Sequence, residues 1–247
     1  MRKSQRLLWN LYRGFWSLQG RVWDEQPGPW RDSLQCIVDV LLGRRTKPDE
    51  WVLDAGCGTG NYAIALAKEG FNVIGTDFAT GMLTKAKQKT AEDLSGRVTF
   101  KRADLNTPLE FDDARFDHLI SISVLQAVAN PTFTLSEFHR VLKPGGTLLL
   151  SLPRPKLNDG SRSFGELVRY RLQHLERRTV CKSLLVVAKA CGDRFYDNPS
   201  WTAQQARYAL ASAGFEVLAV GEGQQIVVVA EKARPNRNAY EHGNGSD

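Results

Sequence analysis

The sequence lacks the features that mark several large classes of protein. Its 247 residues contain four cysteines, which form no CxxC pair and have no histidine at zinc-ligand spacing. No apolar run reaches the roughly 18 residues that a membrane-spanning helix needs. The first twenty residues, MRKSQRLLWNLYRGFWSLQG, have neither the unbroken apolar core nor the small-residue cleavage site of a signal peptide. We therefore expect a cytoplasmic protein without a bound metal.

Positive charge is concentrated in two parts of the chain. The net charge is +6, yet residues 51–152 carry ten basic and eleven acidic side chains. Residues 1–50 carry nine basic and six acidic side chains, and residues 153–200 carry ten and five. The basic, aromatic N-terminal residues could form an amphipathic helix on a membrane surface, and packing against the domain is the alternative. For residues 153–200, a basic surface that binds an acidic ligand competes with a solvated helix face.

Short apolar runs alternate with helix-length segments from residue 51 onward. The expected strands are WVLDA, FNVIGTD, RVTFKRAD, FDHLISISVL and TLLLSLP, and the expected helices are NYAIALAKEG, TGMLTKAKQKTAEDL and TFTLSEFHRVL. This alternation predicts an α/β fold with a doubly wound, mostly parallel sheet. After residue 200 a capping box, TAQQ, begins one more helix. Two final strands, FEVLAV and QQIVVVAEK, are joined by GEG, which predicts a hairpin.

These patterns divide the chain into five parts. A helical N-terminal cap covers residues 1–48, and the ligand-binding core covers residues 49–153. Residues 154–200 contain no β alternation and are expected to be a helical insertion. Residues 201–232 complete the core, and the polar residues 233–247 are expected to be a disordered tail.

The stretch LDAGCGTGNY, residues 53–62, places three glycines between a predicted strand and a predicted helix. A glycine turn at a helix N-terminus presents backbone N–H groups and lets a ligand approach the backbone closely. Gly56, Gly58 and Gly60 have the spacing GxGxG, whereas a dinucleotide-binding turn has GxGxxG. No GK[ST] follows either, so the turn is not a P-loop.

Three aspartates stand at the ends of the first three predicted strands. Asp54 and Asp77 end the first two strands, and Asp104 lies just past the third. Ligands of doubly wound sheets bind at the carboxyl ends of the strands, where an acid about twenty residues after the glycines binds ribose hydroxyls. Asp77 has that spacing, Asp104 could accept from a purine amine, and Asp54 could pair with an ammonium group. S-adenosylmethionine carries all of these groups, has no phosphate, and has a sulfonium cation that suits an acidic site.

The glycine turn is followed in order by GTDFATGMLTKAK, RADLNTP, FDHLISISVLQAV and EFHRVLKPGGTLLLSLP. With these motifs, residues 51–152 resemble the class I S-adenosylmethionine-dependent methyltransferases, and most of all the small-molecule branch of ubiquinone and menaquinone biosynthesis. The similarity resumes at ASAGFEV. The resemblance implies a seven-stranded Rossmann-like methyltransferase fold, S-adenosylmethionine as cofactor and S-adenosylhomocysteine as product. It implies these cofactor-binding residues: Asp54, Gly56, Gly58, Gly60, Asp77, Phe78, Met82, Asp104, Leu105, Ser121 and Ser123. Helix core is the alternative role for Met82.

In this family the N-terminal segment and the insertion after the fifth strand usually cap the substrate pocket. The resemblance therefore makes residues 154–200 a substrate lid. Candidate substrate-binding residues are Tyr12, Trp16 and Trp23 in the N-terminal segment, Gln126 after the fourth strand, and Arg169, Tyr170 and Arg171 in the lid. Core packing is the alternative role for the three N-terminal aromatic residues.

The sequence gives little support for a catalytic base. Many relatives carry a histidine just after the fourth strand, where this chain has Gln126. Among the four histidines only His174, in the lid, could face a substrate, and a solvated helix position is the alternative. Because a sulfonium activates its own methyl group, we expect catalysis to depend on the positioning and desolvation of the acceptor.

Three functions fit these features. The favoured one is a methyltransferase that acts on a small molecule, such as a natural product, a quinone or a lipid-like acceptor, with an acidic or phosphorylated group. The second is an RNA methyltransferase that uses the basic lid, although the Asn/Asp-Pro-Pro-Tyr motif of many such enzymes is missing after the fourth strand. The third is a protein that binds S-adenosylmethionine without transferring its methyl group. The sequence identifies neither the acceptor atom nor the oligomeric state.

Overall fold

The computed structural model describes residues 12–20, 23–25, 30–153, 200–223 and 225–234. Almost all of the expected lid and tail lie outside the described residues, and so do four candidate residues of the lid. These are Arg169, Tyr170, Arg171 and His174. The division of the chain into five parts therefore stays a prediction.

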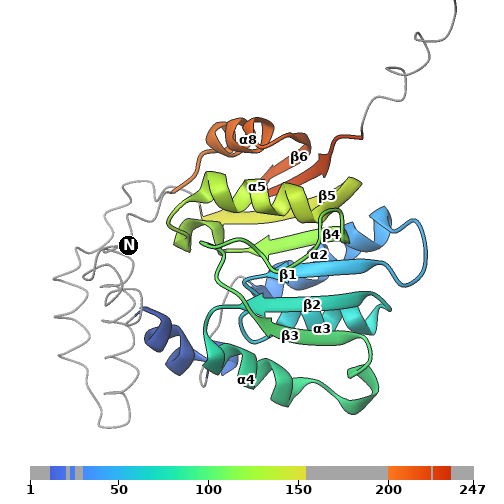
Figure 1. The fold of residues 1–247 in the computed structure, drawn as a ribbon, viewed down its shortest axis with the longest axis vertical. Helices are drawn as coiled ribbons and strands as arrows, with labels where there is room; N and C mark the ends of the chain where they lie inside the picture. Colours follow the sequence, from blue (N-terminus) through green and yellow to red (C-terminus); the bar gives the residue numbers. More distant parts are fainter. Residues whose placement is uncertain (1–11, 21–22, 26–29, 154–199, 224, 235–247) are drawn as a thin grey trace, which may run out of the picture.

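The expected seven-stranded, mostly parallel sheet is confirmed (Figure 1). Its strands are β1 (Trp51–Ala55), β2 (Asn72–Asp77), β3 (Val98–Arg102), β4 (Phe116–Ile122), β5 (Leu142–Pro153), β6 (Phe215–Glu222) and β7 (Gln225–Lys232). They are ordered β3-β2-β1-β4-β5-β7-β6. The first five strands run parallel, and β7 lies antiparallel between β5 and β6. The chain order reverses between β1 and β4, which is where a doubly wound sheet opens a crevice for a ligand.

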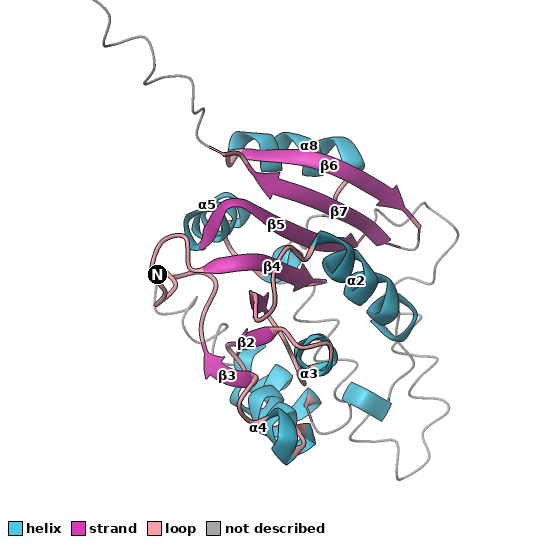
Figure 2. Cartoon of the chain, turned by 90° about the vertical axis from the view of Figure 1, so that its right-hand side faces the viewer, coloured by secondary structure: helices cyan, strands magenta, loops and turns pink. Residues whose placement is uncertain are grey.

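Helices cover both faces of the sheet (Figure 2). The helices α2 (Trp30–Arg44), α3 (Asn61–Lys68) and α4 (Thr80–Lys89) pack on one face, and α5 (Pro131–Val141) and α8 (Ala203–Ser212) pack on the other. Each face has its own apolar core, because the central strands are buried on both sides. This arrangement places the carboxyl ends of β1, β2 and β4 side by side.

Local sequence signals place most helix boundaries correctly. The predicted capping box at α8 is confirmed: the Thr202 side chain accepts from the Gln205 N–H, and the Gln205 side chain accepts from the Thr202 N–H. The expectation of one continuous helix over residues 80–94 is wrong in its second half. Thr90 has an extended backbone, with ψ at 120°, and residues Glu92–Leu94 form a separate 3-10 turn, η2. The Thr90 hydroxyl donates to the Ala86 carbonyl, as β-branched hydroxyl residues often do at a helix end.

Candidate functional site

The three glycines of the turn after β1 have different roles. All have positive φ, at 83°, 54° and 77° for Gly56, Gly58 and Gly60, which side chains with a Cβ rarely adopt. A Cβ at Gly56 would collide with the Val124 side chain, and one at Gly60 would lie 2.8 Å from the Phe100 ring. A Cβ at Gly58 would meet nothing within 4 Å. Gly56 and Gly60 therefore allow close packing of the turn, and Gly58 faces open space that a ligand could use.

Backbone hydrogen bonds fix the turn against β2. The N–H groups of Gly56 and Cys57 both donate to the Thr76 carbonyl at 2.8 Å. The Gly58 N–H donates to Asp77 Oδ2 at 3.0 Å. The glycine turn and the end of β2 thus form one continuous wall, which leads directly into the N-terminus of α3.

Asp54 is buried at the end of β1 without full hydrogen bonding. Its side chain is 1% exposed, and it accepts one hydrogen bond, from the Ala63 backbone N–H in the first turn of α3. Its Oδ2 atom is buried and has no hydrogen-bond partner within the described residues. Burial, and secondarily the charge of Asp77, raises the pKa of Asp54 to about 8. A buried carboxyl of this kind fits a ligand that brings its own positive charge, as an ammonium does.

Asp77 is held by the backbone of the two turns around it. Its Oδ1 accepts from the Ala79 N–H at 2.8 Å, and its Oδ2 accepts from the Gly58 N–H at 3.0 Å. Burial raises the pKa of Asp77 to about 6 against the lowering effect of these backbone donors. The carboxyl is therefore fixed in one orientation at the end of β2, between the glycine turn and the start of α4.

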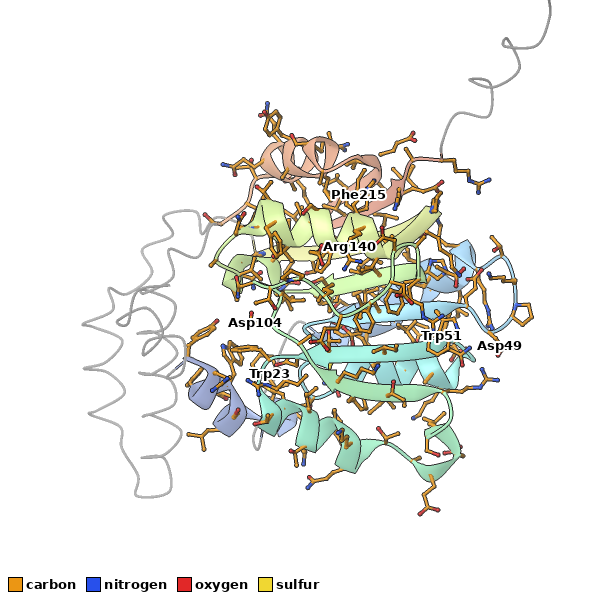
Figure 3. All side chains as sticks on the ribbon, viewed as in Figure 1. Trp23, Asp49, Trp51, Asp104, Arg140 and Phe215 are labelled. Atoms are coloured by element: carbon orange, nitrogen blue, oxygen red, sulfur yellow. The ribbon has the colours of Figure 1, made fainter. Side chains whose placement is uncertain are left out.

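The third acid, Asp104, lies next to Asp77 along the same edge of the sheet. The Ala103 N–H donates to the Asp77 carbonyl at 3.1 Å, which brings the end of β3 against the end of β2. Asp104 Oδ1 accepts from the Asn106 N–H at 3.0 Å and from its side-chain amide at 2.8 Å. Figure 3 shows Asp104 at the carboxyl end of the sheet, opposite the end that carries Trp51. The three acids thus follow one another along β1, β2 and β3, as the sequence predicts.

The match to a known family covers the same part of the chain as these acids. Residues 53–150 match the family model described as a methyltransferase domain. This part of the chain is therefore similar to a methyltransferase domain.

Two curated relatives of the methyltransferase domain are named demethylmenaquinone methyltransferases. One is the demethylmenaquinone methyltransferase of Clavibacter sepedonicus, 38% identical over 121 residues, which are 49% of this chain and 46% of that protein. Another is the demethylmenaquinone methyltransferase of Bacillus subtilis, 28% identical over 60% of this chain and 62% of that protein. The matches to curated relatives thus span about half of their length.

Solved structures share the fold of the methyltransferase domain. The magnesium protoporphyrin IX methyltransferase of Synechocystis PCC 6803, crystallised with S-adenosylhomocysteine, aligns with a TM-score of 0.57 at 22% identity over 82% of this chain and 83% of that chain. A chain from the complex of the Haloferax volcanii Trm112 methyltransferase activator aligns with a TM-score of 0.63 at 19% identity, over 89% and 98% of the two chains. At these identities the structures support the fold alone.

Several predicted cofactor residues of the methyltransferase domain are buried in the wall of the site. Met82 is 3% exposed and Leu105 is 9% exposed, so both also serve the core, as the alternative for Met82 holds. Ser121 is fully buried, and its hydroxyl donates to the Ala55 carbonyl at 2.9 Å, which ties β4 to the end of β1. Phe78 is half-buried directly after Asp77. The structure brings these residues to the predicted edge, and their contacts with a cofactor stay predictions.

The end of β4 in the methyltransferase domain carries a polar network. Ser123 has a positive φ of 56°, and its Oγ accepts from the Gln225 side-chain amide at 2.8 Å. Gln225 also hydrogen-bonds to the Ser151 hydroxyl. Gln126 Nε2 donates to the Ser123 carbonyl at 2.7 Å, while Gln126 Oε1 is buried without a hydrogen-bond partner in the described part of the chain. The network links β4, β5 and β7. Because Gln126 Nε2 faces the Ser123 carbonyl, Gln126 Oε1 lies on the opposite side of the amide.

The N-terminal aromatic residues pack against the loop that follows β2. Tyr12, 7% exposed, stacks on Phe78 with ring centroids 5.9 Å apart and planes at 23°. Trp16 meets Tyr12 and Trp23 edge-on, at 6.0 and 5.5 Å. Core packing, the alternative stated for these residues, therefore describes Tyr12, whereas Trp16 and Trp23 are half-buried. Figure 3 places Trp23 at the same end of the sheet as Asp104.

Two other side chains with reactive groups, His118 and Cys57, are buried within the fold. His118 is buried at the opposite end of the sheet, with Nε2 2.7 Å from Glu50, and burial lowers its pKa. Cys57 is buried, and burial raises the pKa of its thiol well above the usual range, as expected for a packing residue. In the described ranges, no cluster of three or more His, Cys, Asp or Glu side chains could hold a metal ion, and no helix is long and apolar enough to cross a membrane.

Sequence reasoning missed Asp24 and Lys89. Asp24 Oδ2 accepts from Lys89 Nζ at 2.8 Å, and Asp24 Oδ1 accepts from the Thr59 hydroxyl of the glycine turn at 2.6 Å. The two residues are 65 positions apart, and neither belongs to a motif. No local pattern in the sequence could therefore have joined them.

Proposed function

We propose that this protein transfers a methyl group from S-adenosylmethionine to a small-molecule acceptor. The observation that carries the proposal is the buried carboxyl of Asp54, whose Oδ2 has no hydrogen-bond partner among the described residues, beside the open face of Gly58. A cationic ligand with a narrow amino-acid end would satisfy both features. Known methyltransferase relatives named for a quinone substrate support a small, largely apolar acceptor. A location in the cytoplasm stays a prediction from cysteine usage.

The residues present fit the cofactor at each of its parts. S-adenosylmethionine supplies, when bound, a methyl group made electrophilic by the sulfonium. Asp54 would pair with the ammonium, the Gly58 turn would accommodate the methionine end, and Asp77 would accept hydrogen bonds from the ribose hydroxyls. Asp104 would accept from the adenine amine, with Leu105 and Met82 around the ring.

On the acceptor side, Gln126 is proposed to orient the substrate. Its amide nitrogen donates to the Ser123 carbonyl, which fixes the orientation of the amide, and Oε1 has no partner in the described ranges, so Oε1 is the acceptor atom available to a ligand. A neutral amide oxygen accepts an O–H or N–H hydrogen bond but is a poor proton acceptor. Gln126 would therefore aim the lone pair of the acceptor at the methyl group, which fits catalysis by positioning.

Binding of the cofactor tests the proposal directly. S-adenosylmethionine and S-adenosylhomocysteine are each expected to raise the midpoint of thermal unfolding, by an amount that grows with ligand concentration, whereas NAD and ATP are not. Incubation with methyl-labelled S-adenosylmethionine and a cell extract split into organic-soluble and RNA fractions then identifies the acceptor class. Demethylmenaquinone is the first pure acceptor to try. Absence of any stabilisation by either cofactor form would reject the proposal.

The same experiment separates the two alternative functions. Label in the RNA fraction, together with tRNA binding that weakens steeply with salt, would favour an RNA methyltransferase. Cofactor binding without label in any fraction would favour a binding protein that transfers no methyl group. The described residues contain no feature that raises either alternative above the small-molecule hypothesis.

We expect cofactor binding to be linked to the titration of Asp54. In the protein without ligand this carboxyl is mostly protonated at pH 7, because its pKa is about 8. Pairing with an ammonium requires the ionised form, so binding near pH 7 should release up to about one proton and affinity should rise up to about tenfold per pH unit between about 6 and 8. Calorimetric titration with S-adenosylhomocysteine in two buffers of different ionisation enthalpy measures the release. Proton uptake at pH 7, or no exchange at all, would contradict this assignment.

A further inference from the structure

The N-terminal segment, defined as residues 12–20 and Trp23–Glu25, is joined to the cofactor site at three points. Tyr12 stacks on Phe78, directly after Asp77. Gly20 lies so close to the start of α4 that a Cβ on it would be 2.7 Å from the Gly81 carbonyl oxygen. The third point is the 3-10 turn η1 (Trp23–Glu25), which reaches the glycine turn through Asp24.

The contact through Asp24 is a compact polar cluster. Asp24 Oδ1 accepts from the Thr59 hydroxyl at 2.6 Å and from the Asn61 side-chain amide at 3.1 Å. Lys89 Nζ, at the end of α4, donates to Asp24 Oδ2 at 2.8 Å, to Thr59 Oγ1 at 3.3 Å and to Asn61 Oδ1. Both charged side chains are about three-quarters buried, with exposures of 24% for Lys89 and 23% for Asp24. One carboxylate and one ammonium therefore connect η1, the glycine turn, α3 and α4.

The position of Thr59 makes this cluster more than a surface ion pair. Thr59 is 1% exposed and lies between Gly58 and Gly60, whose backbones have positive φ. On one side, the Gly58 N–H is held by Asp77, and on the other, the Thr59 hydroxyl is held by Asp24. The conformation of the turn that would meet the methionine end of the cofactor thus depends on a residue of the N-terminal segment.

The electrostatics of Asp24 agree with a fixed, ionised carboxylate. Burial raises its pKa, but hydrogen bonds from Lys89, Thr59 and Asn61 offset this and keep the pKa below its ordinary value. Asp24 is therefore ionised throughout the neutral range. Asp54, in contrast, has a raised pKa, and pairing with a cationic ligand would favour its ionised form.

We propose that Asp24 is a positioning residue for the cofactor site, because it locks the N-terminal segment to Thr59 and thereby preorganises the glycine turn. The inference rests on the proposed function. Without the lock, the turn and η1 gain conformational freedom that cofactor binding must then remove, which weakens affinity. Asp24 touches no reacting atom, so its loss should weaken cofactor binding and leave the chemical step unchanged.

The test compares Asp24→Asn, Lys89→Met and the double variant with the wild type. Each single change should raise the dissociation constant of S-adenosylhomocysteine by about tenfold, within the usual range for coupled sites. The double variant should show little further loss, because both changes break the same cluster. Lys89→Arg keeps the charge and should restore most of the affinity. Unfolding midpoints without ligand should stay within about 3 °C of wild type, since the pair is partly exposed.

Asp39→Asn is the matched control. Asp39 is an exposed carboxylate on α2 that also accepts a side-chain amide, from Gln35 at 2.8 Å, and its loss should leave the dissociation constant unchanged. Wild-type affinity for S-adenosylhomocysteine in Asp24→Asn, or equal losses in Asp39→Asn, would overturn the positioning role alone. Failure of the wild type to bind the ligand would overturn the proposed function and this inference together. If Asp24→Asn does not fold, the dissociation constants of Lys89→Met and Lys89→Arg are compared instead. A loss of affinity in Lys89→Met that Lys89→Arg does not show supports the positioning role, and equal affinities overturn it.

Discussion

Replacement of Asp54 by asparagine is expected to abolish measurable cofactor binding without loss of stability. The Asp54→Asn side chain keeps an oxygen for the Ala63 N–H, but it presents a neutral amide where the ligand ammonium needs a carboxylate. Loss of a buried charge partner typically weakens binding by roughly 2–5 kcal/mol, so we expect a dissociation constant at least about 30-fold higher. Calorimetry with S-adenosylhomocysteine measures it, with Asp112→Asn, an exposed carboxyl of the 109–112 loop, as the control.

The stability of the same variant should depend less on pH than that of the wild type. The folded state holds the Asp54 proton up to a pKa of about 8, whereas the unfolded chain releases it near a pKa of about 4. Between these values the folded state binds more protons, so the wild-type free energy of unfolding falls as pH rises from about 4 to about 8. The Asp54→Asn change removes that part of the slope. Thermal unfolding between about pH 5 and pH 9 tests this, and an Asp54→Asn variant that is less stable than wild type at the upper end of that range would contradict the assignment.

Replacement of Asp77 by alanine should eliminate cofactor binding and also weaken the fold. The carboxyl is the proposed partner of the ribose hydroxyls, and it is the acceptor for the Gly58 and Ala79 backbone N–H groups. Alanine leaves both donors without their acceptor, and each unsatisfied buried group costs roughly 1–3 kcal/mol. We expect no detectable stabilisation by S-adenosylmethionine and a lower unfolding midpoint in its absence.

The Asp77 result is checked by thermal shift with and without S-adenosylmethionine. Asp93→Ala, an exposed acid in η2, is the control, and its ligand response should match that of the wild type. Tight cofactor binding by the Asp77→Ala variant would refute the proposed site. A normal unfolding midpoint with lost binding would instead show that the backbone N–H groups find water as their partner.

The sequence predicted the strands and the acids well because both follow local rules. Short apolar runs bounded by glycine and aspartate are strand signals wherever they occur. Asp54 and Asp77 are found by their position at strand ends alone, since parallel strands end at one edge of the sheet. The helix at residues 80–94 was overextended because nothing in its composition marks the extended backbone at Thr90.

In the glycine turn, some features follow from the local sequence and others follow from packing against distant residues. Its spacing and its position between a strand and a helix were enough to exclude a dinucleotide and to point toward S-adenosylmethionine. Its sequence could not reveal that Gly56 and Gly60 are required by Val124 and Phe100, which lie far away along the chain, while Gly58 alone faces open space. Three identical residues receive different roles only after packing brings their neighbours in.

By itself, the sequence determined the doubly wound fold, the order of its elements and the edge at which we expect a ligand to bind, because periodicity and strand-end chemistry are encoded within short stretches. The tertiary structure alone decided that Asp54 Oδ2 has no hydrogen-bond partner in the described part of the chain, that the Gln126 amide donates to the Ser123 carbonyl, and that Asp24 accepts from the Thr59 hydroxyl. Each of these depends on burial or on hydrogen bonds between distant segments. Such contacts are set by how the layers pack, and no local pattern of residues specifies them.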